Sequence, residues 1–480
     1  MQSDLNFYFQ SPSGNLFNKI WYKETYNLNI PENELLNHYC TVGYKQNLNP
    51  SLYFNTKWYR ETYLLPEDLN PLEHFCKNVN ERNLRPNEKC KFFIRDLSFN
   101  DWTIIPKNDF IPLRNEIKRI NLLLPAEGLS AGPATIYLFA NFLANKNYKV
   151  RIIFCFGSFS NKYINDLNNR FNMNNNIEYD SLTENCIKIS YDDIFIASAW
   201  WTVYPLKFIL GYLNVKKIIW FIQENELLLH AGDENYAKAL SCYNMDYYSL
   251  INTSILFDDL KKILFPFTDE KYCKENCVCF EPAFDTTKLK YIEKPDRKNL
   301  KIIFYSRDAN IAKRNCVKLV NNLIYELFQN RIISKNDKVF GFGQKKGVIQ
   351  LSNGFYYEEL GFLNLDEYYK LLNEADILIS FQMAPHPSYP PFEMSFCNGV
   401  TLHTNFSNKN QETISRYTDK IIMCDPHINS LLNGMETAIK KVKENNISRE
   451  PPKLLNTDWN IVLDKCHKFI LNKLVLPRNT

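Results

Sequence analysis

Two successive runs of apolar strands alternating with helix-like stretches constrain this 480-residue chain more than any other feature. In the first run, residues 119–223, the apolar segments RINLLL, KVRIIFCF, DDIFIASAW and KKIIWFIQ are separated by helix-like or polar stretches. The second run begins with LKIIFYSRD at residues 300–308 and continues through NCVKLVNNLIYELFQN, DKVFGFG, LDEYYKLLNEADILIS and KIIMCDP. This alternation is typical of parallel, doubly wound sheets. The sequence therefore predicts an α/β protein with two Rossmann-like domains.

A tandem repeat precedes the first run. Residues 17–52 and 54–88 match, with FNKIWYKETYNL against FNTKWYRETYLL and LLNHYCTVGYKQNLNP against LEHFCKNVNERNLRP. Each copy predicts a short helix with the W-Y-x-E-T-Y pattern, a turn, and a second helix that carries His38 or His74. Two such units bury little surface alone, so we expect them to stack on each other or on the main body. The two histidines are expected on packed helix faces rather than at a metal site.

These patterns divide the chain into four parts. We expect a helical tandem-repeat domain at 1–95, a linker at 96–117, a first Rossmann-like domain at 118–285 and a second at 286–480. The last helical segment, WNIVLDKCHKFILNKLV, has an apolar helical period and can pack back on either Rossmann-like half.

Composition excludes several classes of function. The 57 basic and 53 acidic residues leave a net charge of +4, which gives no reason to expect nucleic acid as a partner. The 13 cysteines lack a metal-ligand spacing, and CKENCVC has no partner motif, so we expect free thiols and no metal. No apolar run reaches the ~18 residues of a spanning helix, which favours a cytoplasmic protein. Lys261, Lys262 and the lysines of 288–301 are compatible with peripheral association with the inner face of a membrane, although such lysines are usually solvated.

Loops that follow predicted strands carry the candidate site residues. In the first half, Gly128 and Gly132 precede a helix predicted at 134–143, where backbone N–H groups can meet a phosphate or an acceptor. An ordinary strand-to-helix turn explains these glycines equally well, because the loop is not G-x-G-x-x-G. In the second half, Arg307 follows a strand, and Lys313 and Arg314 are predicted at the start of the next helix. Such cations can neutralise a diphosphate without a metal.

The segment Ser380–Gly399 is the richest of these loops. It follows the apolar run ADILIS and contains His386, Ser388, Tyr389 and Glu393. A carboxylate just inside a helix can accept hydrogen bonds from ribose hydroxyls, while a serine hydroxyl and helix N–H groups can hold phosphate oxygens. Glu393 can equally be a simple helix cap, and the residues alone leave both readings open.

Several of these segments together resemble a known family. The S-A-G-P-A-T loop, F-Y-S-R with the following K-R-N, F-I-Q-E-N-E at 221–226 and P-H-P-S-Y-P-P-F-E-M at 385–394 are similar to bacterial glycosyltransferases of family 4, which have the GT-B fold. The likeness is strongest to WsaF-type rhamnosyltransferases and spans about 118–460. The N-terminal repeat resembles an accessory module found beside such enzymes. The resemblance implies two Rossmann-like domains that face a cleft, with the nucleotide on the second domain and the acceptor on the first.

Within that resemblance, residues acquire expected roles. Family 4 enzymes commonly carry two glutamates eight positions apart; Glu393 matches the second, which binds ribose, whereas the first falls on Pro385. The loss of that carboxylate leaves the donor sugar in doubt, and His386 can contact the donor instead. The resemblance implies that the polar cluster after the fourth strand, Gln223, Glu224 and Glu226, faces the acceptor. Trp200 and Trp201 follow another strand and can stack on an acceptor sugar, although aromatic residues near a strand end are more often part of the core. No catalytic base is identified, and His386 and Glu224 are the catalytic candidates.

The expected function is transfer of a sugar from a nucleotide diphosphate donor, by resemblance dTDP-rhamnose or a related deoxysugar, to a surface polysaccharide or a lipid-linked glycan. The resemblance implies retention at the anomeric carbon without a metal or other cofactor. The alternatives are a GT-B sugar-nucleotide epimerase or phosphorylase, and a non-catalytic glycan-binding scaffold. The sequence does not set the oligomeric state.

Overall fold

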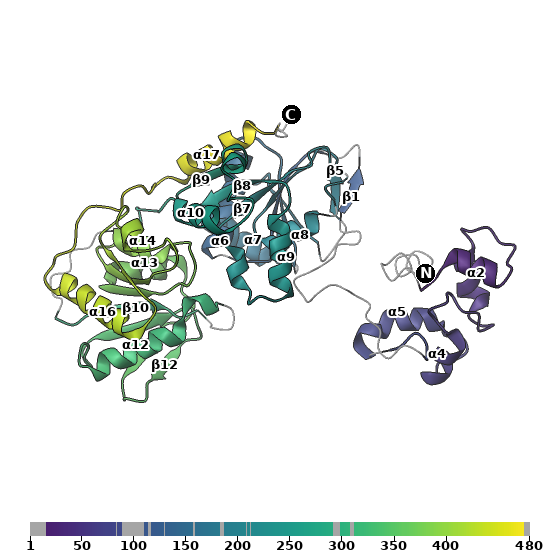
Figure 1. Cartoon of the computed structure of the whole chain (residues 1–480), viewed down its shortest axis with the longest axis horizontal. Helices are drawn as coiled ribbons and strands as arrows, with labels where there is room; N and C mark the ends of the chain where they lie inside the picture. The colour runs from purple at the N-terminus through teal and green to yellow at the C-terminus, as the bar shows by residue number, and fades with distance from the viewer. Residues whose placement is uncertain are drawn as a thin grey trace. The chain divides into compact units, whose positions relative to one another are not determined.

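The computed structural model describes residues 16–82, 84–88, 110–113, 117–128, 130–156, 159–182, 187–207, 209–211, 213–290, 298–307 and 312–474. The chain forms two compact units, Met1–Asn108 and Asp109–Thr480 (Figure 1). Most of the linker predicted at 96–117 lies outside the described residues, but β1 (Phe110–Leu113) falls within it and pairs with β5 (Ile187–Ser190) in a small parallel sheet.

The two sequence repeats of the first unit fold alike. Its helices are α2 (Lys19–Thr25), α3 (Leu35–His38), the π-helical turn η1 (Tyr39–Gly43), α4 (Thr56–Thr62) and α5 (Pro71–Arg82). Asn18 and Asn55 cap α2 and α4 by accepting the N–H of the tryptophan three residues later. The hydroxyl of buried Tyr22 bonds to His38 Nδ1 at 3.1 Å, and Tyr59 bonds to His74 Nδ1 at 3.0 Å. The repeated histidines therefore hold repeated tyrosines in a packed core.

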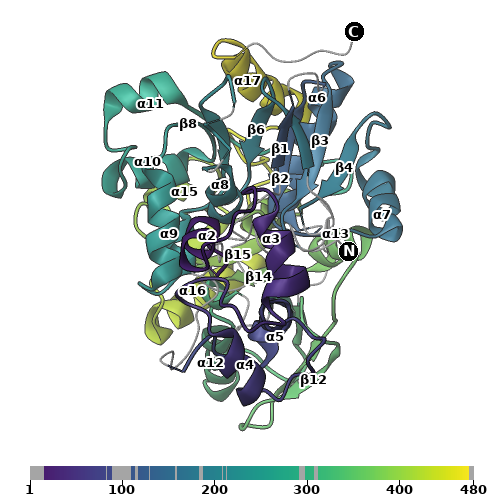
Figure 2. The ribbon, with the colours of Figure 1, turned by 90° about the vertical axis from the view of Figure 1, so that its right-hand side faces the viewer.

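The first half of the second unit is a parallel sheet in the order β4-β3-β2-β6-β7-β8-β9. Figure 2 labels β4, β3, β2, β6 and β8 of this sheet, from right to left. Its strands are β2 (Ile120–Leu124), β3 (Val150–Phe154), β4 (Glu178–Ser181), β6 (Ile194–Ala197), β7 (Ile218–Ile222), β8 (Tyr247–Asn252) and β9 (Cys277–Phe280). Side chains of successive strand residues enter opposite cores: Leu122 packs in one and Leu123 in the other. Both faces of this sheet are therefore covered, as expected for parallel strands.

Helices form the covering layers of this first sheet. One face carries α6 (Ala131–Asn145), α7 (Asn161–Phe171) and α17 (Trp459–Leu471). The other carries α8 (Trp200–Leu206), the 3₁₀ turn η2 (Glu226–Leu229), α9 (Glu234–Tyr243), α10 (Ser254–Ile263) and α11 (Glu270–Asn276). The C-terminal α17 thus returns from the second half and packs beside α6 and β9 (Figure 1).

The second half repeats this plan with the strand order β12-β13-β11-β10-β14-β15-β16, in which only β12 is antiparallel to its neighbour. The strands are β10 (Lys301–Tyr305), β11 (Lys338–Phe342), β12 (Gly347–Gln350), β13 (Tyr356–Glu359), β14 (Ile377–Ser380), β15 (Val400–Thr404) and β16 (Ile421–Cys424). Helices α12 (Val317–Gln329) and α16 (Ile428–Lys443) cover one face, whereas α13 (Leu365–Glu374), α14 (Pro390–Phe396) and α15 (Gln411–Ile414) cover the other. The predicted α/β class with two Rossmann-like domains is confirmed.

Two local predictions were wrong. Helix α6 begins at Ala131, so Gly132 lies in its first turn rather than before it. Lys313 and Arg314 do not open α12; they form the 3₁₀ turn η3 (Lys313–Asn315), and Cys316 with φ +52° separates that turn from the helix. This left-handed residue stops a single helix from running through both segments.

Within the described ranges, no helix is both long and apolar enough to cross a membrane, and no cluster of three or more His, Cys, Asp or Glu side chains is arranged to hold a metal ion.

Candidate functional site

The loop 381–389, between β14 and α14, forms the centre of the candidate site. Ser388 has φ +66°, and this left-handed turn lets its N–H donate to His386 Nδ1 at 3.0 Å. The imidazole is thereby fixed and buried, while its Nε2 has no hydrogen-bond partner among the described residues. Burial, with the charges of Lys409 and Arg314, lowers the pKa of His386 to about 3, so the ring is neutral.

Glu224 reaches this loop from the other half of the unit. It follows β7, and its Oε2 accepts a hydrogen bond from Gln382 Nε2 at 3.1 Å. Burial raises the pKa of the Glu224 carboxyl, while Arg314, Lys409 and the backbone of Asn225 and His386 act in the opposite direction. This side chain therefore joins the two halves at the carboxyl edges of their sheets.

A buried lysine lies under the same loop. Lys409 Nζ donates to the Gln382 carbonyl at 2.7 Å and lies 3.1 Å from His403 Nε2. His403 Nδ1 bonds to the Ser380 carbonyl. Because a carbonyl only accepts, Nδ1 carries the proton, and Nε2 must accept from Lys409. Burial lowers the pKa of Lys409 to about 7 despite the attraction of Glu224.

The cations predicted in the second half lie at different depths. Arg314 is half-buried, and its charge acts on Glu224, Glu226 and His386. Its backbone carbonyl accepts from Met383 N–H, so η3 is anchored to the 381–389 loop. Lys313 is exposed, and half-buried Arg307 lies beside Gly343. Of the three cations, the structure brings Arg314 into the centre of the site.

Glu393 lies in the first turn of α14, where it faces a tyrosine of α13. Tyr368 hydroxyl donates to Glu393 Oε2 at 2.5 Å. Burial raises the pKa of Glu393 to about 7, although Tyr368 and the charge of Arg170 lower it. Arg170 belongs to α7 in the first half, so groups from both halves act on the Glu393 carboxyl.

Tyr389 makes the second direct link between the halves. Asn252, the last residue of β8, donates to the Tyr389 hydroxyl at 2.8 Å, and Thr135 of α6 lies 3.2 Å from it. Asn408 Nδ2 donates to the Ile255 carbonyl at 3.0 Å, which adds a third link.

The glycine loop of the first half does not present its backbone as predicted. Gly128 N–H donates to Tyr163 Oη at 2.8 Å, and the same hydroxyl is 3.0 Å from the Gly128 carbonyl. Tyr163 therefore bonds the backbone groups of Gly128 that were expected to meet a ligand, whereas the role expected for the N–H groups at the start of α6 stays a prediction. The Gly132 carbonyl accepts from Gln223 Nε2 at 2.9 Å, which leaves Gln223 Oε1 buried without a partner among the described residues.

The tryptophans divide between core and site edge. Trp200 is 0% exposed, donates through Nε1 to His230 Nε2 at 3.0 Å, and packs edge-on against Trp201. It is therefore a core residue and cannot stack on an acceptor, while Trp201 is half-buried. Glu226 caps the same region by accepting the Trp200 N–H, and burial raises the pKa of Glu226 to about 8.

Sequence reasoning missed Gln382, Lys409, His403, Tyr368 and Arg170. Gln382 and His403 follow or lie in apolar strands and could have been found from that position. The other three gain their roles only from contacts with distant segments.

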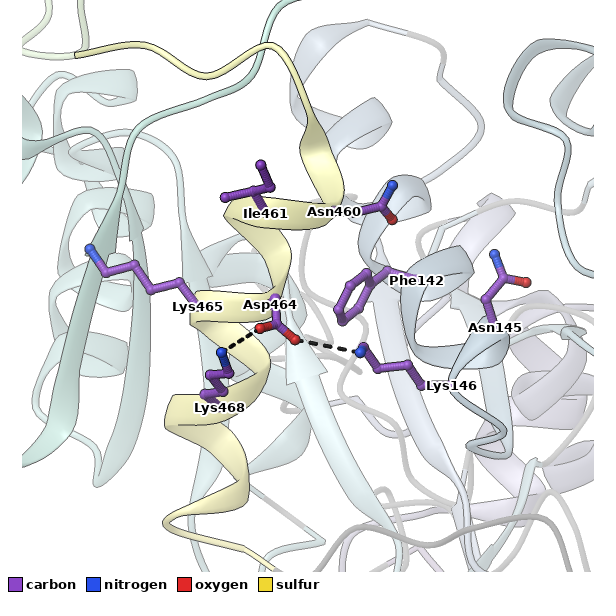
Figure 3. Close-up of a pocket in the computed structure, with 8 residues that line it drawn as sticks. All are labelled: Phe142, Asn145, Lys146, Asn460, Ile461, Asp464, Lys465 and Lys468. Carbon is purple, nitrogen blue, oxygen red and sulfur yellow. Dashed lines mark ion pairs between the residues drawn. The ribbon is translucent and has the colours of Figure 1, made fainter.

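A depression of about 670 Å³ lies between α6 and α17 (Figure 3). Asp464 pairs there with Lys146 at 3.4 Å and Lys468 at 2.8 Å. It contains none of the predicted site residues, and its acidic group is already paired, so we place the site at the 381–389 loop.

Solved structures of other proteins are similar to this chain. A solved structure of a mutant of TarM from S. aureus, in complex with fondaparinux, alpha-GlcNAc-glycerol and UDP, is similar with a TM-score of 0.51 and 9% identity, over 74% of this chain and 99% of that chain. HepE from Anabaena, in complex with UDP-glucose, has a TM-score of 0.49 and 10% identity, over 74% of this chain and 100% of that chain. The two-domain architecture is the GT-B fold.

One curated relative is the O-antigen biosynthesis protein RfbC of Myxococcus xanthus, 24% identical over 290 residues. The match covers 60% of this chain and 21% of RfbC, so the chain spans about a fifth of the length of that relative. Residues 119–254 match the model of the WsaF N-terminal domain, and residues 300–436 match that of the WsaF C-terminal domain. With one model on each Rossmann-like half, in this order, and more than half of the chain matched, the chain belongs to the WsaF family.

Proposed function

We propose that this protein is a glycosyltransferase that moves a sugar from a nucleoside diphosphate to a glycan acceptor in the synthesis of a surface polysaccharide. One observation carries the proposal: the buried polar groups gather where the carboxyl edges of two parallel sheets meet, around loop 381–389. That edge is where doubly wound folds bind nucleotides. The match to RfbC, a protein named for O-antigen biosynthesis, supports the acceptor class.

The donor would bind on the second half. Arg307, Lys313 and Arg314 would oppose the diphosphate charge, and Ser388 and the start of α14 would offer hydrogen-bond donors. Glu393, oriented by Tyr368, would accept from the ribose hydroxyls. His386 Nε2, which has no hydrogen-bond partner in the described part of the chain, would meet the donor sugar. The acceptor would enter from the first half past Gln223 and Glu224. We favour dTDP-rhamnose or a related deoxysugar nucleotide as the donor, on the likeness of the 385–394 segment.

The reaction would proceed with retention. The bond between the anomeric carbon and the diphosphate oxygen breaks, and a bond from the acceptor oxygen forms on the same face. The acceptor proton passes to the leaving diphosphate, whose negative charge is held by the cations above. The residues of this chain would thus bind and orient the donor and the acceptor and exclude water, and no protein nucleophile is required. The chain would need no metal for this step, because the cations of η3 supply the charge.

A nucleotide panel tests the proposal. Thermal unfolding with UDP, dTDP, GDP and ADP should show stabilisation by at least one of them, since a ligand at a hundred times its dissociation constant adds ~2.7 kcal/mol. The matching nucleotide-sugar should then release its diphosphate only when a glycan acceptor is present. Absence of any shift across the panel would contradict a donor site.

The same assay separates the alternatives. An epimerase or phosphorylase would change the nucleotide-sugar without a glycan acceptor. A scaffold would keep its glycan binding after Glu393→Ala, whereas a transferase should lose nucleotide binding and transfer together. Tyr356→Phe, at an exposed tyrosine on β13, is the matched control for handling and folding.

A further inference from the structure

Lys409 is the most unusual charged residue near the site, because its side chain is 0% exposed. A buried ammonium must be compensated by hydrogen bonds or by an opposite charge. Its two bonded acceptors, the Gln382 carbonyl and His403 Nε2, are neutral. Its only described carboxylate influence is Glu224, which acts at longer range through charge. Lys409 is therefore incompletely compensated.

Gln382 connects this lysine to the other half of the unit. The backbone carbonyl of Gln382 accepts from Lys409, and its side-chain amide donates to Glu224. Its own N–H donates to Thr404 Oγ1 at 2.9 Å. The bond from Lys409 therefore holds Gln382, the second residue of loop 381–389, in place. The Gln382 amide in turn connects the loop to Glu224 in the first half.

The charges around the loop do not balance. Arg314 and protonated Lys409 are positive, and the two histidines are neutral because burial and nearby cations lower the pKa of each. Burial raises the pKa of the facing Glu224 carboxyl, and it raises the pKa of Glu226, on which Arg314 also acts, to about 8, so Glu226 is largely protonated at neutral pH. Even with Glu224 ionised, the cluster holds one positive charge in excess at neutral pH when Lys409 is protonated. Arg314 Nε and His386 Nε2 are also buried without a hydrogen-bond partner among the described residues. Such unpartnered nitrogens beside excess positive charge favour an anionic ligand.

We propose that Lys409 is a positioning residue of the donor site, which holds loop 381–389 through Gln382 and takes up a proton when the diphosphate of the donor binds. The inference rests on the proposed function, since it assigns the anion to a nucleoside diphosphate. Lys409 need not touch the ligand, because a diphosphate beside Arg314 acts on the ammonium through charge in a site that excludes water.

The direction of the pH effect follows from the groups that face Lys409. These are Glu224 after β7, Cys316 before α12, His386 in the loop and His403 in β15, while Arg314 in η3 acts on the same Glu224 and His386. Without ligand, the pKa of Lys409 is about 7. A bound anion favours the charged form and raises that pKa, so binding takes up a proton at mildly alkaline pH. Affinity for the nucleoside diphosphate should fall as pH rises above neutrality, because Lys409 then loses its proton. The terminal phosphate of the ligand, with pKa ≈ 6, is already ionised in this range and does not cause the change.

Calorimetry of the whole chain with UDP or dTDP, whichever binds, tests this inference. Titrations at about pH 8, in buffers of different ionisation enthalpy, report the net protons taken up. Wild-type protein should show uptake, and Lys409→Met should lose most of it and bind about tenfold more weakly. Lys409→Arg, which stays charged, should restore affinity without proton uptake. If no nucleotide binds the wild type, the proposed function fails; if one binds without uptake, only the present inference fails.

Lys420 provides a matched control. It is 2% exposed in the same half and donates to the carbonyls of Ser395 at 2.8 Å and Glu450 at 3.0 Å. Lys420→Met should destabilise the fold as a buried lysine loss does, yet keep wild-type proton uptake. Equal loss of uptake in both variants would overturn the assignment to Lys409. Should Lys409→Met not fold, Lys409→Arg still decides the question, because it keeps the charge and should bind the nucleotide without proton uptake, whereas wild-type uptake in Lys409→Arg would overturn the inference.

Discussion

At the residue scale, the orientation of Glu393 depends on one hydroxyl. Tyr368→Phe removes the donor to Glu393 Oε2 and, with it, a contribution that lowers the pKa of that carboxyl. More of the Glu393 carboxyl should then be protonated near neutral pH and accept ribose hydroxyls less well. We expect nucleoside diphosphate affinity to weaken by about 1.5–3 kcal/mol, the range for a hydrogen bond to a charged group, as measured by calorimetry. Tyr369→Phe, at the half-buried neighbour, should bind as the wild type does; an equal loss there would contradict the assignment.

Glu226 predicts a pH dependence of stability. Its folded pKa is about 8, above its usual value of 4.5, so its contribution to stability is complete below about pH 4.5 and is lost as pH rises toward 8. Glu226→Gln keeps an acceptor for the Trp200 N–H and cannot ionise. Urea unfolding should therefore give similar stability for variant and wild type at about pH 5, and a more stable variant at about pH 9. Glu436→Gln on the exposed side of α16 should show no such gain in stability at about pH 9.

The position of a residue at the site was predictable from sequence only where the residue lies in a segment that follows a strand. Glu224 comes just after β7, His386 lies in the loop after β14, and Glu393 lies in the first turn of the helix that follows this loop. In a parallel sheet such segments lie at the carboxyl edge, where sites form. Lys409 lies in an irregular segment, and nothing in its neighbours indicates burial beneath a loop that starts 28 residues earlier, at 381. Gly128 misled the prediction because Tyr163, 35 residues away, takes its backbone groups.

At the scale of elements, α17 shows most clearly that the packing partner of a helix is set by the tertiary structure. Its period predicted a helix but not its partner, and in the structure Leu463 and Cys466 enter the core of the first half, while His467 Nε2 lies 3.0 Å from Tyr148 Oη. Leu463, 1% exposed, should cost about 2–5 kcal/mol when changed to Ala. Ile461→Ala on the same helix, at a side chain 64% exposed, should change stability by less than about 0.5 kcal/mol. Chemical unfolding measures both, and equal effects would show that α17 does not dock as described.

Among the strands, the predicted apolar segments form β2, β3, β6, β7, β10, β11, β14 and β16, whereas the interior strand β8 and the edge strands β4, β9 and β12 were not predicted. Segments such as ADILIS form β14, whose residues are all buried. β4 and β12 escaped notice because they are partly or wholly exposed and lack apolar runs of useful length. An edge strand pairs with only one neighbour and can be exposed, so its side chains form only a weak apolar pattern in the sequence.

For the whole molecule, the halves of the second unit are joined at the site itself. Tyr389 hydroxyl bonds to Asn252 and lies near Thr135, so the loop that would hold the donor also fixes the first half. If closure excludes water from the donor, Tyr389→Phe should raise the ratio of donor hydrolysis to glycan transfer. The assay compares diphosphate release without acceptor to product formed with it, once a donor is known. Tyr356→Phe, at a side chain 62% exposed on β13, should leave the ratio unchanged. Loss of transfer with no gain in hydrolysis would instead assign Tyr389 to donor binding alone, and closure would then depend on the other links between the halves, Glu224 with Gln382 and Asn408 with Ile255.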